Sequence, residues 1–302
     1  MDIVMHEHVS DKILGKPFYH NRLPEALRQT VDYVGTSGHV ASLPEQLHAR
    51  VLAPFDAEVW QNWYTANSEE DVGTTKTGKK VVAVVHGGGI LSSPYRIERA
   101  YSEKLTAQYA AKLEPQEITD LLDGQVASVQ GEVPVFTYGD ILNGKNKGKR
   151  NYTIVLDFDT AKRTKSGHQD IAGLYDNPLF VARAGGVEEA KAFLEKAKQK
   201  WSKYGNWHPF SGIDPEESQG RLLFLGNYND SGLDGYYNLC NNGRFVGVRE
   251  RSEQLAPKAP HARGSSYRSV NLDERVIEAL QNGKAFPYGD MIYVPVPKKV
   301  WG

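Results

Sequence analysis

The sequence has only one cysteine, Cys240, among its 302 residues. A single thiol excludes an intrachain disulfide framework and a cysteine-rich metal site. The nine histidines are scattered and show no H-x-x-x-H or Cys/His spacing of the kind that binds zinc. We therefore expect neither a metal ion nor a cofactor.

An excess of charge and a long apolar run are also missing. Lys and Arg number 36, Asp and Glu number 37, and the net charge is −1. Without a basic surplus or a recognisable fold motif, we expect no nucleic-acid partner. No window approaches the roughly 18 apolar residues of a membrane span, so we expect no membrane insertion. Residues 1–18 lack the basic start and apolar core of a signal peptide, and we expect a soluble protein, either cytoplasmic or associated with a virion.

Residues 226–243, here named the cassette, have a restricted composition. They read GNYNDSGLDGYYNLCNNG, and all but two are Asn, Gly, Asp, Tyr, Ser or Cys. The apolar runs at 222–225 and 245–248 predict a buried strand on each side. Tyr offers rigid contact area, while Ser, Gly and Asn offer adaptable hydrogen bonding, so this composition is typical of a recognition surface.

The six residue types also share a codon relationship. Each is reached from an Asn codon ending in a pyrimidine by changes at its first two adenines, whereas Lys, Glu, Gln, Met and Trp are not. The cassette contains none of those five. The alternative is an ordinary loop, because Asn, Gly and Asp supply turns and positive φ. Directed variation and an ordinary loop both stay open at this point.

Apolar periodicity predicts helices and strands in an irregular order. Residues 1–40 read as a loosely regular arm, and 68–80 as a polar, turn-rich segment. Predicted helices lie at 43–66 (divided at Pro54), 94–113, 115–122, 187–204 and 272–280. Predicted strands lie at 81–85, 133–138, 152–158, 222–225, 244–248 and 291–296. Because helices and strands do not alternate as βαβ units, we expect an α+β fold.

Two short motifs suggest chemistry. His86-Gly87-Gly88-Gly89 follows a predicted strand and is similar to the oxyanion loop of lipase-type hydrolases. The chain has no G-x-S-x-G serine, and three glycines also permit a sharp turn. Asp157 and Asp159 end another predicted strand and suggest an oxygen-ligand site for Mg²⁺, as in haloacid-dehalogenase-type phosphotransferases. Thr160 comes one residue too early for that motif, and a solvated loop explains the two acids equally well.

Three segments together resemble a known family. They are 205–210 (GNWHPF), 226–228 (GNY) and 244–249 (RFVGVR). They resemble the C-terminal core of the C-type-lectin fold in formylglycine-generating-enzyme-like proteins, and especially the variable proteins of diversity-generating retroelements. In that family a Gly-Asn/Ser-Trp/Tyr strand opens a polar cassette and a Gly-x-Arg strand closes it. Variation is directed to the adenines of Asn-type codons there, which agrees with the codon pattern.

The resemblance implies a single C-type-lectin-like domain over 1–302, with an N-terminal arm at about 1–40 and a cassette at 226–243. The expected fold is mixed, with irregular loops and flanking helices. It implies partly buried Leu233 and Leu239, a core Trp207, close packing at Gly247 and an anchoring Arg249. The surface positions that it implies for ligand binding are Tyr228, Asn229, Asp230, Asp234, Tyr236, Tyr237, Asn238, Cys240, Asn241 and Asn242.

The expected function is binding of a protein or surface-receptor ligand, without catalysis and with the oligomeric state left open. The first alternative is a hydrolase or Mg²⁺-dependent phosphotransferase that uses His86–Gly89 or Asp157 and Asp159. The second is a structural or virion component, since Tyr-rich surfaces also form subunit contacts.

Overall fold

The computed structural model describes residues 14–249, except for 104, 107–108, 127–131, 229–231, 237–238 and 240, together with 286–288 and 291–293. The chain divides into two compact units, residues 1–254 and 255–302. In the second unit, β13 (Phe286–Tyr288) pairs antiparallel with β14 (Met291–Tyr293). Strand β14 lies within the strand predicted at 291–296. The helix predicted at 272–280 lies outside the described residues. That one domain spans 1–302 stays a prediction.

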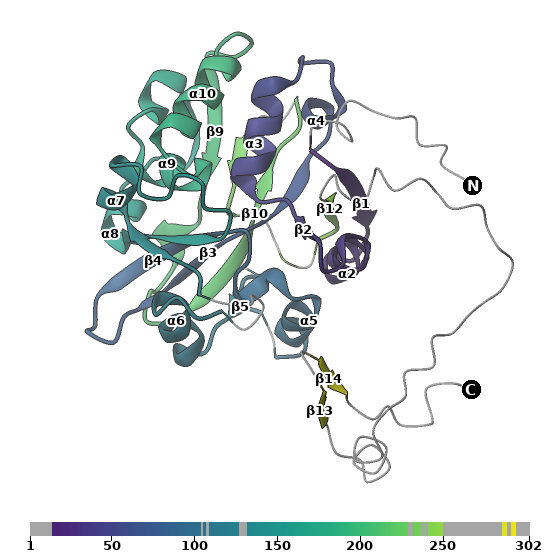
Figure 1. Ribbon diagram of the computed structural model, residues 1–302. Helices are drawn as coiled ribbons and strands as arrows, with labels where there is room; N and C mark the ends of the chain where they lie inside the picture. Colours follow the sequence, from purple (N-terminus) through teal and green to yellow (C-terminus); the bar gives the residue numbers. More distant parts are fainter. Residues whose placement is uncertain are drawn as a thin grey trace, which may run out of the picture. The chain divides into compact units, whose positions relative to one another are not determined.

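A mixed sheet forms the centre of the first unit (Figure 1). Its strands, in spatial order, are β6 (Val135–Thr137), β7 (Tyr152–Asp157), β4 (Lys80–His86), β3 (Tyr64–Thr74), β10 (Gln219–Leu225), β11 (Gly232–Asp234), β9 (Lys203–Trp207) and β8 (Gly167–Asp170), and β5 (Ala111–Lys112) also pairs with β10. The pairs β6–β7 and β11–β9 are parallel, and the others are antiparallel. The α+β class expected from the sequence is confirmed.

A second, three-stranded sheet involves the N-terminal segment. Its order is β1 (Lys16–His20), β12 (Gly243–Arg249) and β2 (Gly38–Val40), and α2 (Leu23–Val34) lies between β1 and β2 in the chain. The description of 16–40 as a loosely regular arm is therefore wrong. The two short strands pair with a strand more than 200 residues later, and local sequence carries no signal of such a partner.

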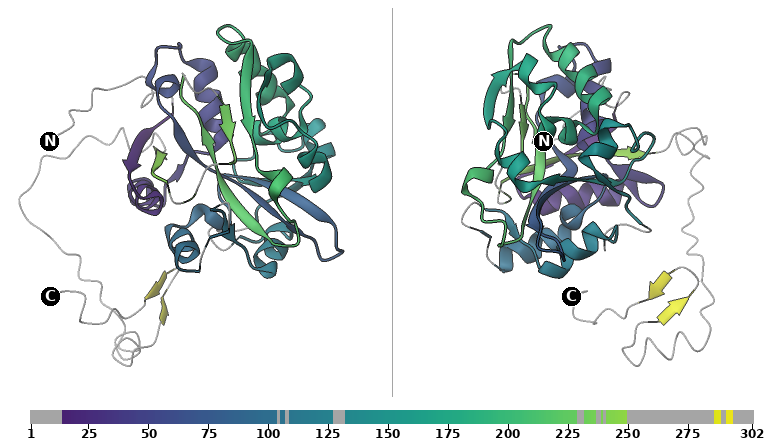
Figure 2. Two further views of the ribbon diagram at one scale, coloured as in Figure 1. Left: turned by 180° about the vertical axis from the view of Figure 1, so that it is seen from behind. Right: turned by 90° about the vertical axis from the view of Figure 1, so that its left-hand side faces the viewer.

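Helices cover both faces of the larger sheet (Figure 1; Figure 2). On one face lie α3 (Leu43–Leu52), α9 (Pro178–Ala184) and α10 (Val187–Ala197), and on the other lie α5 (Pro94–Ser102) and α6 (Pro115–Leu122). The shorter turns are α4 (Glu58–Gln61), α7 (Tyr138–Leu142), α8 (Phe158–Lys162) and the 3₁₀ segments η1 (Ile90–Ser92), η2 (Ile171–Leu174) and η3 (Phe210–Gly212). No helix in the described part of the chain is both long and apolar enough to cross a membrane.

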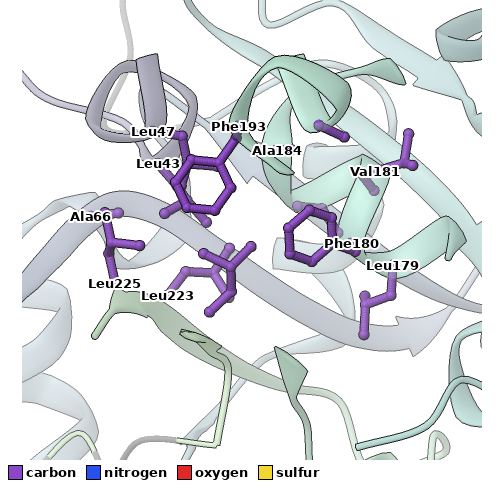
Figure 3. Packing of buried hydrophobic residues seen from close by; sticks show 14 of the residues in the cluster. Leu43, Leu47, Ala66, Leu179, Phe180, Val181, Ala184, Phe193, Leu223 and Leu225 are labelled. Carbon is purple, nitrogen blue, oxygen red and sulfur yellow. The ribbon is translucent and has the colours of Figure 1, made fainter. Parts of the chain in front are cut away.

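The strand that enters the cassette, β10, is buried on both faces. Leu223 and Leu225 pack beneath α3, α9 and α10, where Phe180 and Phe193 point toward them (Figure 3). Leu222 and Phe224 point to the opposite face of the sheet and belong to a separate hydrophobic core, which α2 and α5 cover. With apolar contacts on both sides, β10 is a rigid support for the residues that follow it.

Several predicted boundaries are wrong in a consistent way. The predicted helices at 94–113 and 187–204 end early, at Ser102 and Ala197. The helix predicted at 43–66 is divided around Pro54 as expected, into α3 and α4, but its second part ends at Gln61. Strands begin at Tyr64, Ala111 and Lys203. The segment 68–80 is not mainly turn, because β3 continues to Thr74. Its acids Glu69, Glu70 and Asp71 are at most 2% exposed. Three consecutive acidic residues are typical of a polar loop in sequence. Their burial in a strand is possible only because tertiary contacts offset the cost of removing them from water.

Candidate ligand-binding surface

The cassette is not one continuous loop, because it contributes a strand to the larger sheet. Strand β11 lies between β10 and β9, and pairs antiparallel with the first and parallel with the second. Leu233 stands opposite Leu225 on one side and Asn206 on the other. The chain then leaves the sheet and returns as β12 in the smaller sheet. The cassette therefore connects the two sheets of the first unit.

Two leucines fasten the cassette to the cores on opposite faces of the sheet. Leu233 and Leu239 are both 0% exposed. Leu233 belongs to the core beneath α9 and α10, and Leu239 to the core that contains Phe224 and Phe245. The prediction that both point inward is correct, although they are fully and not partly buried.

The described residues of the first unit outside the cassette are here named the frame. Frame side chains from three helices bind main-chain carbonyl groups of the cassette. Arg50 of α3 donates from Nη2 to the Gly226 carbonyl oxygen at 2.6 Å. Tyr101 of α5 donates its hydroxyl to the Leu239 carbonyl oxygen. Arg183 of α9 donates from Nη1 to the Leu233 carbonyl oxygen at 3.4 Å. Because every residue type has this carbonyl, these three contacts do not depend on which side chain the cassette carries.

Arg183 also fixes the strands around the cassette. Its Nε and Nη2 bind the Glu70 carboxylate at 2.6 and 2.8 Å, and its Nη1 binds the Asn206 amide oxygen at 2.6 Å. Nη2 further donates to the Trp207 carbonyl oxygen at 2.9 Å. Arg183 and Glu70 are almost fully buried, so the two charges compensate each other out of contact with water. One guanidinium thus links β3, β9 and β11.

Two glycines, here named the glycine floor, leave room for the indole ring of Trp207. Gly232 of the cassette stands opposite Gly205 of β9, and the indole of Trp207 lies over both. A Cβ atom would come within 1.8 Å of the ring at position 205 and within 1.9 Å at position 232. Trp207 is half-buried at this site, whereas the resemblance implies a core position.

The strand that closes the cassette agrees with the roles that the resemblance implies. A Cβ at Gly247 would lie 2.8 Å from the Tyr33 ring and 2.9 Å from a Val34 methyl group, so α2 approaches β12 as closely as glycine allows. Arg249 donates from Nε to the Tyr33 carbonyl oxygen at 2.7 Å, and its guanidinium lies 4.0 Å from the centre of the Tyr33 ring. Gly247 and Arg249 both hold β12 against α2.

Five of the ten predicted surface residues can be placed. Tyr236 is 55% exposed, and Tyr228, Asp234, Asn241 and Asn242 are half-buried. Tyr228 packs edge-on against Phe55 and Trp201, with ring centres 6.4 and 5.1 Å apart. The other five lie outside the described residues: Asn229, Asp230, Tyr237, Asn238 and Cys240. The ligand-binding role of all ten stays a prediction.

Arg221 is a functional candidate that sequence reasoning missed. It lies on β10 opposite Glu70 of β3, and it is 2% exposed. In the part of the chain that the structure describes, none of its three guanidinium nitrogens has a hydrogen-bond partner. Burial lowers its pKa, while the charges of Glu70 and Asp234 act in the opposite direction. Arg221 directly precedes the apolar run 222–225, where an arginine gives no sequence signal of burial.

A comparison with solved structures decides the family. No family model and no curated protein matches the chain. A solved structure from work on how the C-type lectin fold accommodates massive sequence variation in Nanoarchaeota matches with a TM-score of 0.62 and 32% identity. The match covers 78% of this chain and 97% of the other. The chain belongs to the C-type-lectin-fold variable proteins of diversity-generating retroelements. The predicted family and fold are both confirmed.

In this variable protein, the histidine of the glycine motif is a core residue. His86 is 0% exposed, and its Nδ1 and Nε2 lie 2.9 Å from the Ser68 hydroxyl and the Ala182 carbonyl oxygen. Burial lowers the pKa of His86 to about 4, so the ring is neutral at pH 7. It links β3 and β4 to α9.

The amides after the three glycines already hold an anion from the same chain. Glu69 accepts hydrogen bonds from the Ile90 and Leu91 amides at 2.5 and 2.7 Å. A Cβ at Gly89 would lie 2.2 Å from this carboxylate, so glycine is needed for the close approach. The resemblance to a hydrolase oxyanion loop therefore reflects an internal carboxylate site.

The aspartate motif lies elsewhere. Asp157 and Asp159 are exposed, and Asp157 caps α8 by accepting a hydrogen bond from the Thr160 amide at 3.1 Å. Along the paired strands β4 and β7, Asp157 stands opposite Val81 while His86 stands opposite Tyr152, so the two motifs occupy opposite ends. Over the described residues, no three His, Cys, Asp or Glu side chains gather as metal ligands do.

Proposed function

We propose that this variable protein binds a protein or surface-receptor ligand through the cassette, on a constant frame and without catalysing a reaction. The observation that carries the proposal is that Arg50, Tyr101 and Arg183 bind the cassette through its main-chain carbonyls. These carbonyls belong to Gly226, Leu233 and Leu239, which lie outside the ten contact positions, so the frame holds the cassette without using any side chain that is proposed to vary. The proposed contact residues are Tyr228, Asn229, Asp230, Asp234, Tyr236, Tyr237, Asn238, Cys240, Asn241 and Asn242.

The described contact positions fit this role. Tyr236 offers an exposed aromatic ring, and aromatic anchors carry a large share of binding energy in protein interfaces. The Tyr236 amide donates to Asp234 Oδ1 at 2.6 Å, and Asn242 donates from Nδ2 to the Tyr19 hydroxyl at 3.1 Å. Both contacts are local to the surface, and losing them leaves Leu233 and Leu239 in place.

A library experiment tests the proposal. The ten contact positions are randomised with Asn-type codons while Gly232, Leu233 and Leu239 are kept, and the full chain is displayed and selected against panels of surface proteins. We expect most members to fold and some to bind one target specifically. A library in which most members are unfolded, or which yields no specific binder, contradicts the proposal. The same library on an Arg50→Met frame is the matched control and is expected to fold less well.

Genomic sequence tests the directed-variation part separately. We expect a near-repeat of the cassette with Asn codons at the variable positions, next to a reverse-transcriptase gene. A locus without such a repeat contradicts directed variation in this chain, and the binding function then depends on the library result alone.

The alternatives have less support. The proposal includes no catalytic role, because His86 and Asp157 lie at opposite ends of paired strands and because Glu69 accepts hydrogen bonds from the amides after the glycines. A subunit-contact role for the cassette predicts an obligate assembly. Mass measurement in solution separates that role from a ligand-binding monomer.

A further inference from the structure

A pocket opens where the frame meets the cassette. Its volume is about 140 Å³, and Trp63, Trp207 and Phe224 form its aromatic walls. Asn227 and Asp234 supply the polar part of the lining. The aromatic walls come from the frame, whereas both polar residues belong to the cassette.

The size of the pocket selects one ring. An engineered apolar cavity of about 150 Å³ in another protein binds benzene, so a volume of about 140 Å³ is that of a single six-membered ring. Aromatic walls favour an aromatic occupant over an aliphatic one, because rings pack well in edge-to-face and offset geometries.

Neighbouring groups hold the pocket walls in place in the absence of a ligand. Trp207 is held over Gly205 and Gly232, and its ring meets His168 edge-on at 4.7 Å. Trp63 has the Arg244 guanidinium 5.2 Å from its ring centre and lies 6.4 Å from the Phe224 ring. A preorganised pocket loses little conformational freedom on binding, which raises affinity.

The polar lining selects the substituent on the ring. A carboxylate accepts hydrogen bonds at several positions and cannot donate one, and Asp234 already accepts from the Tyr236 amide. A phenol combines a ring for the walls with a hydroxyl donor for such a carboxylate. We propose that this pocket takes the phenol ring of a tyrosine side chain of the protein partner. This inference rests on the proposed function and names the anchor group that the constant part of the site recognises.

The arrangement divides recognition between frame and cassette. Trp63, Trp207 and Phe224 accept the ring in every variant, while position 234 sets the preference for its substituent. Asp234 is one of the proposed variable positions, so variation there changes which ring the pocket prefers without altering its walls.

Small probes test the pocket on the full-length chain. Binding of p-cresol, the tyrosine side-chain analogue, and of toluene, the phenylalanine analogue, is measured by saturation-transfer NMR. We expect p-cresol to bind about tenfold more tightly than toluene, as a hydrogen bond to a charged group implies. Asp234→Ala should remove this preference and leave toluene binding unchanged. Tyr95→Ala, at an exposed tyrosine outside both the lining and the cassette, should change neither.

Trp207→Ala should weaken both probes by about tenfold or more, since one aromatic wall is lost. Circular dichroism checks that this variant folds, and the Asp234→Ala result decides the proposal if it does not. Absent p-cresol binding, equal binding of the two probes, or a preference that survives Asp234→Ala overturns the proposal.

A competition arm identifies the source of the phenol. We expect p-cresol to displace a protein ligand selected from the library, and failure to compete would show that the pocket does not take the partner's side chain. A library that yields binders while p-cresol fails to bind overturns the pocket alone. A pocket that binds p-cresol in a chain whose library yields no binders overturns the display function, and with it the partner as the source of the phenol, but leaves the pocket's preference for a phenol standing.

Discussion

Arg183 holds Glu70 in a two-point ion pair inside the protein, with Nε–Oε1 and Nη2–Oε2 distances of 2.6 and 2.8 Å. Both side chains are at most 1% exposed. Gly235 of the cassette lies directly over the pair, since a Cβ there would come within 2.3 Å of Nη2 and 2.5 Å of Oε2. The pair therefore supports the cassette from below, and its neighbour at 235 has no room for a side chain.

Arg183→Met should lower the free energy of unfolding by about 3–5 kcal/mol, because Glu70 is left buried without its counter-charge. Urea unfolding measures the loss. Arg163→Met is the control, since Arg163 is exposed and should change stability by no more than about 0.5 kcal/mol. Equal losses in the two variants would show that the ion pair does not support the fold.

Gly232→Ala should destabilise the protein by about 1–3 kcal/mol, because the new methyl group displaces the Trp207 indole from its floor. The near-ultraviolet circular dichroism of tryptophan should change with it. Gly173→Ala is the matched control, because no atom lies within 4 Å of a Cβ at that position. An unchanged spectrum and melting temperature in Gly232→Ala would contradict the glycine-floor geometry.

Tyr236→Ala should weaken binding of a selected ligand and leave stability within about 0.5 kcal/mol of the wild type, since its side chain is 55% exposed. Phe224→Ala should instead cost about 3–5 kcal/mol of stability, because Phe224 is 3% exposed within a packed core. Calorimetry with a ligand, alongside urea unfolding, measures both. A loss of several kcal/mol of stability at Tyr236 would place it in the core and not on the surface.

Asp71→Asn should make stability less sensitive to pH. Burial, with the neighbouring Glu69 charge, raises the pKa of Asp71 well above its usual value, and burial raises the pKa of Glu69 to about 7 although Asp71 acts to lower it. A carboxyl group with a raised folded-state pKa stabilises the fold fully below its unfolded pKa and loses that contribution as pH rises through the folded value. Arg96, ion-paired with Glu117, moderates both shifts.

The variant should therefore gain stability relative to the wild type as pH rises from about 4.5 to 7, by up to about 1.4 kcal/mol per pH unit for one proton. The lowered pKa values of His86 and His208, both about 4, make stability rise with pH. Both proteins contain these histidines, so their contribution cancels when the variant is compared with the wild type. Urea unfolding at pH 4.5, 6 and 7.5 provides the test. A stability difference that does not vary with pH would contradict the raised pKa of Asp71.

Sequence reasoning succeeded where local chemistry decides structure. The helix at 115–122 has the same bounds in the structure, and the strands predicted at 81–85 and 152–158 lie within one or two residues of β4 and β7. Leu233 and Leu239 are the only apolar aliphatic residues of the cassette, and their inward orientation follows from that contrast. The prediction from sequence failed for 16–40, where β1 and β2 form only because β12 pairs with them.

The sequence by itself determined the α+β class and the position of the restricted-composition cassette and predicted the family, because these depend on residue types and spacings along the chain. Only the tertiary structure decided that Arg50, Tyr101 and Arg183 hold the cassette by its main chain, and that Glu69 fills the amides after the glycines. These contacts join residues 21 to 176 positions apart. No local pattern encodes such pairs, since their energy arises from burial and hydrogen bonding that exist only after the strands and helices have packed.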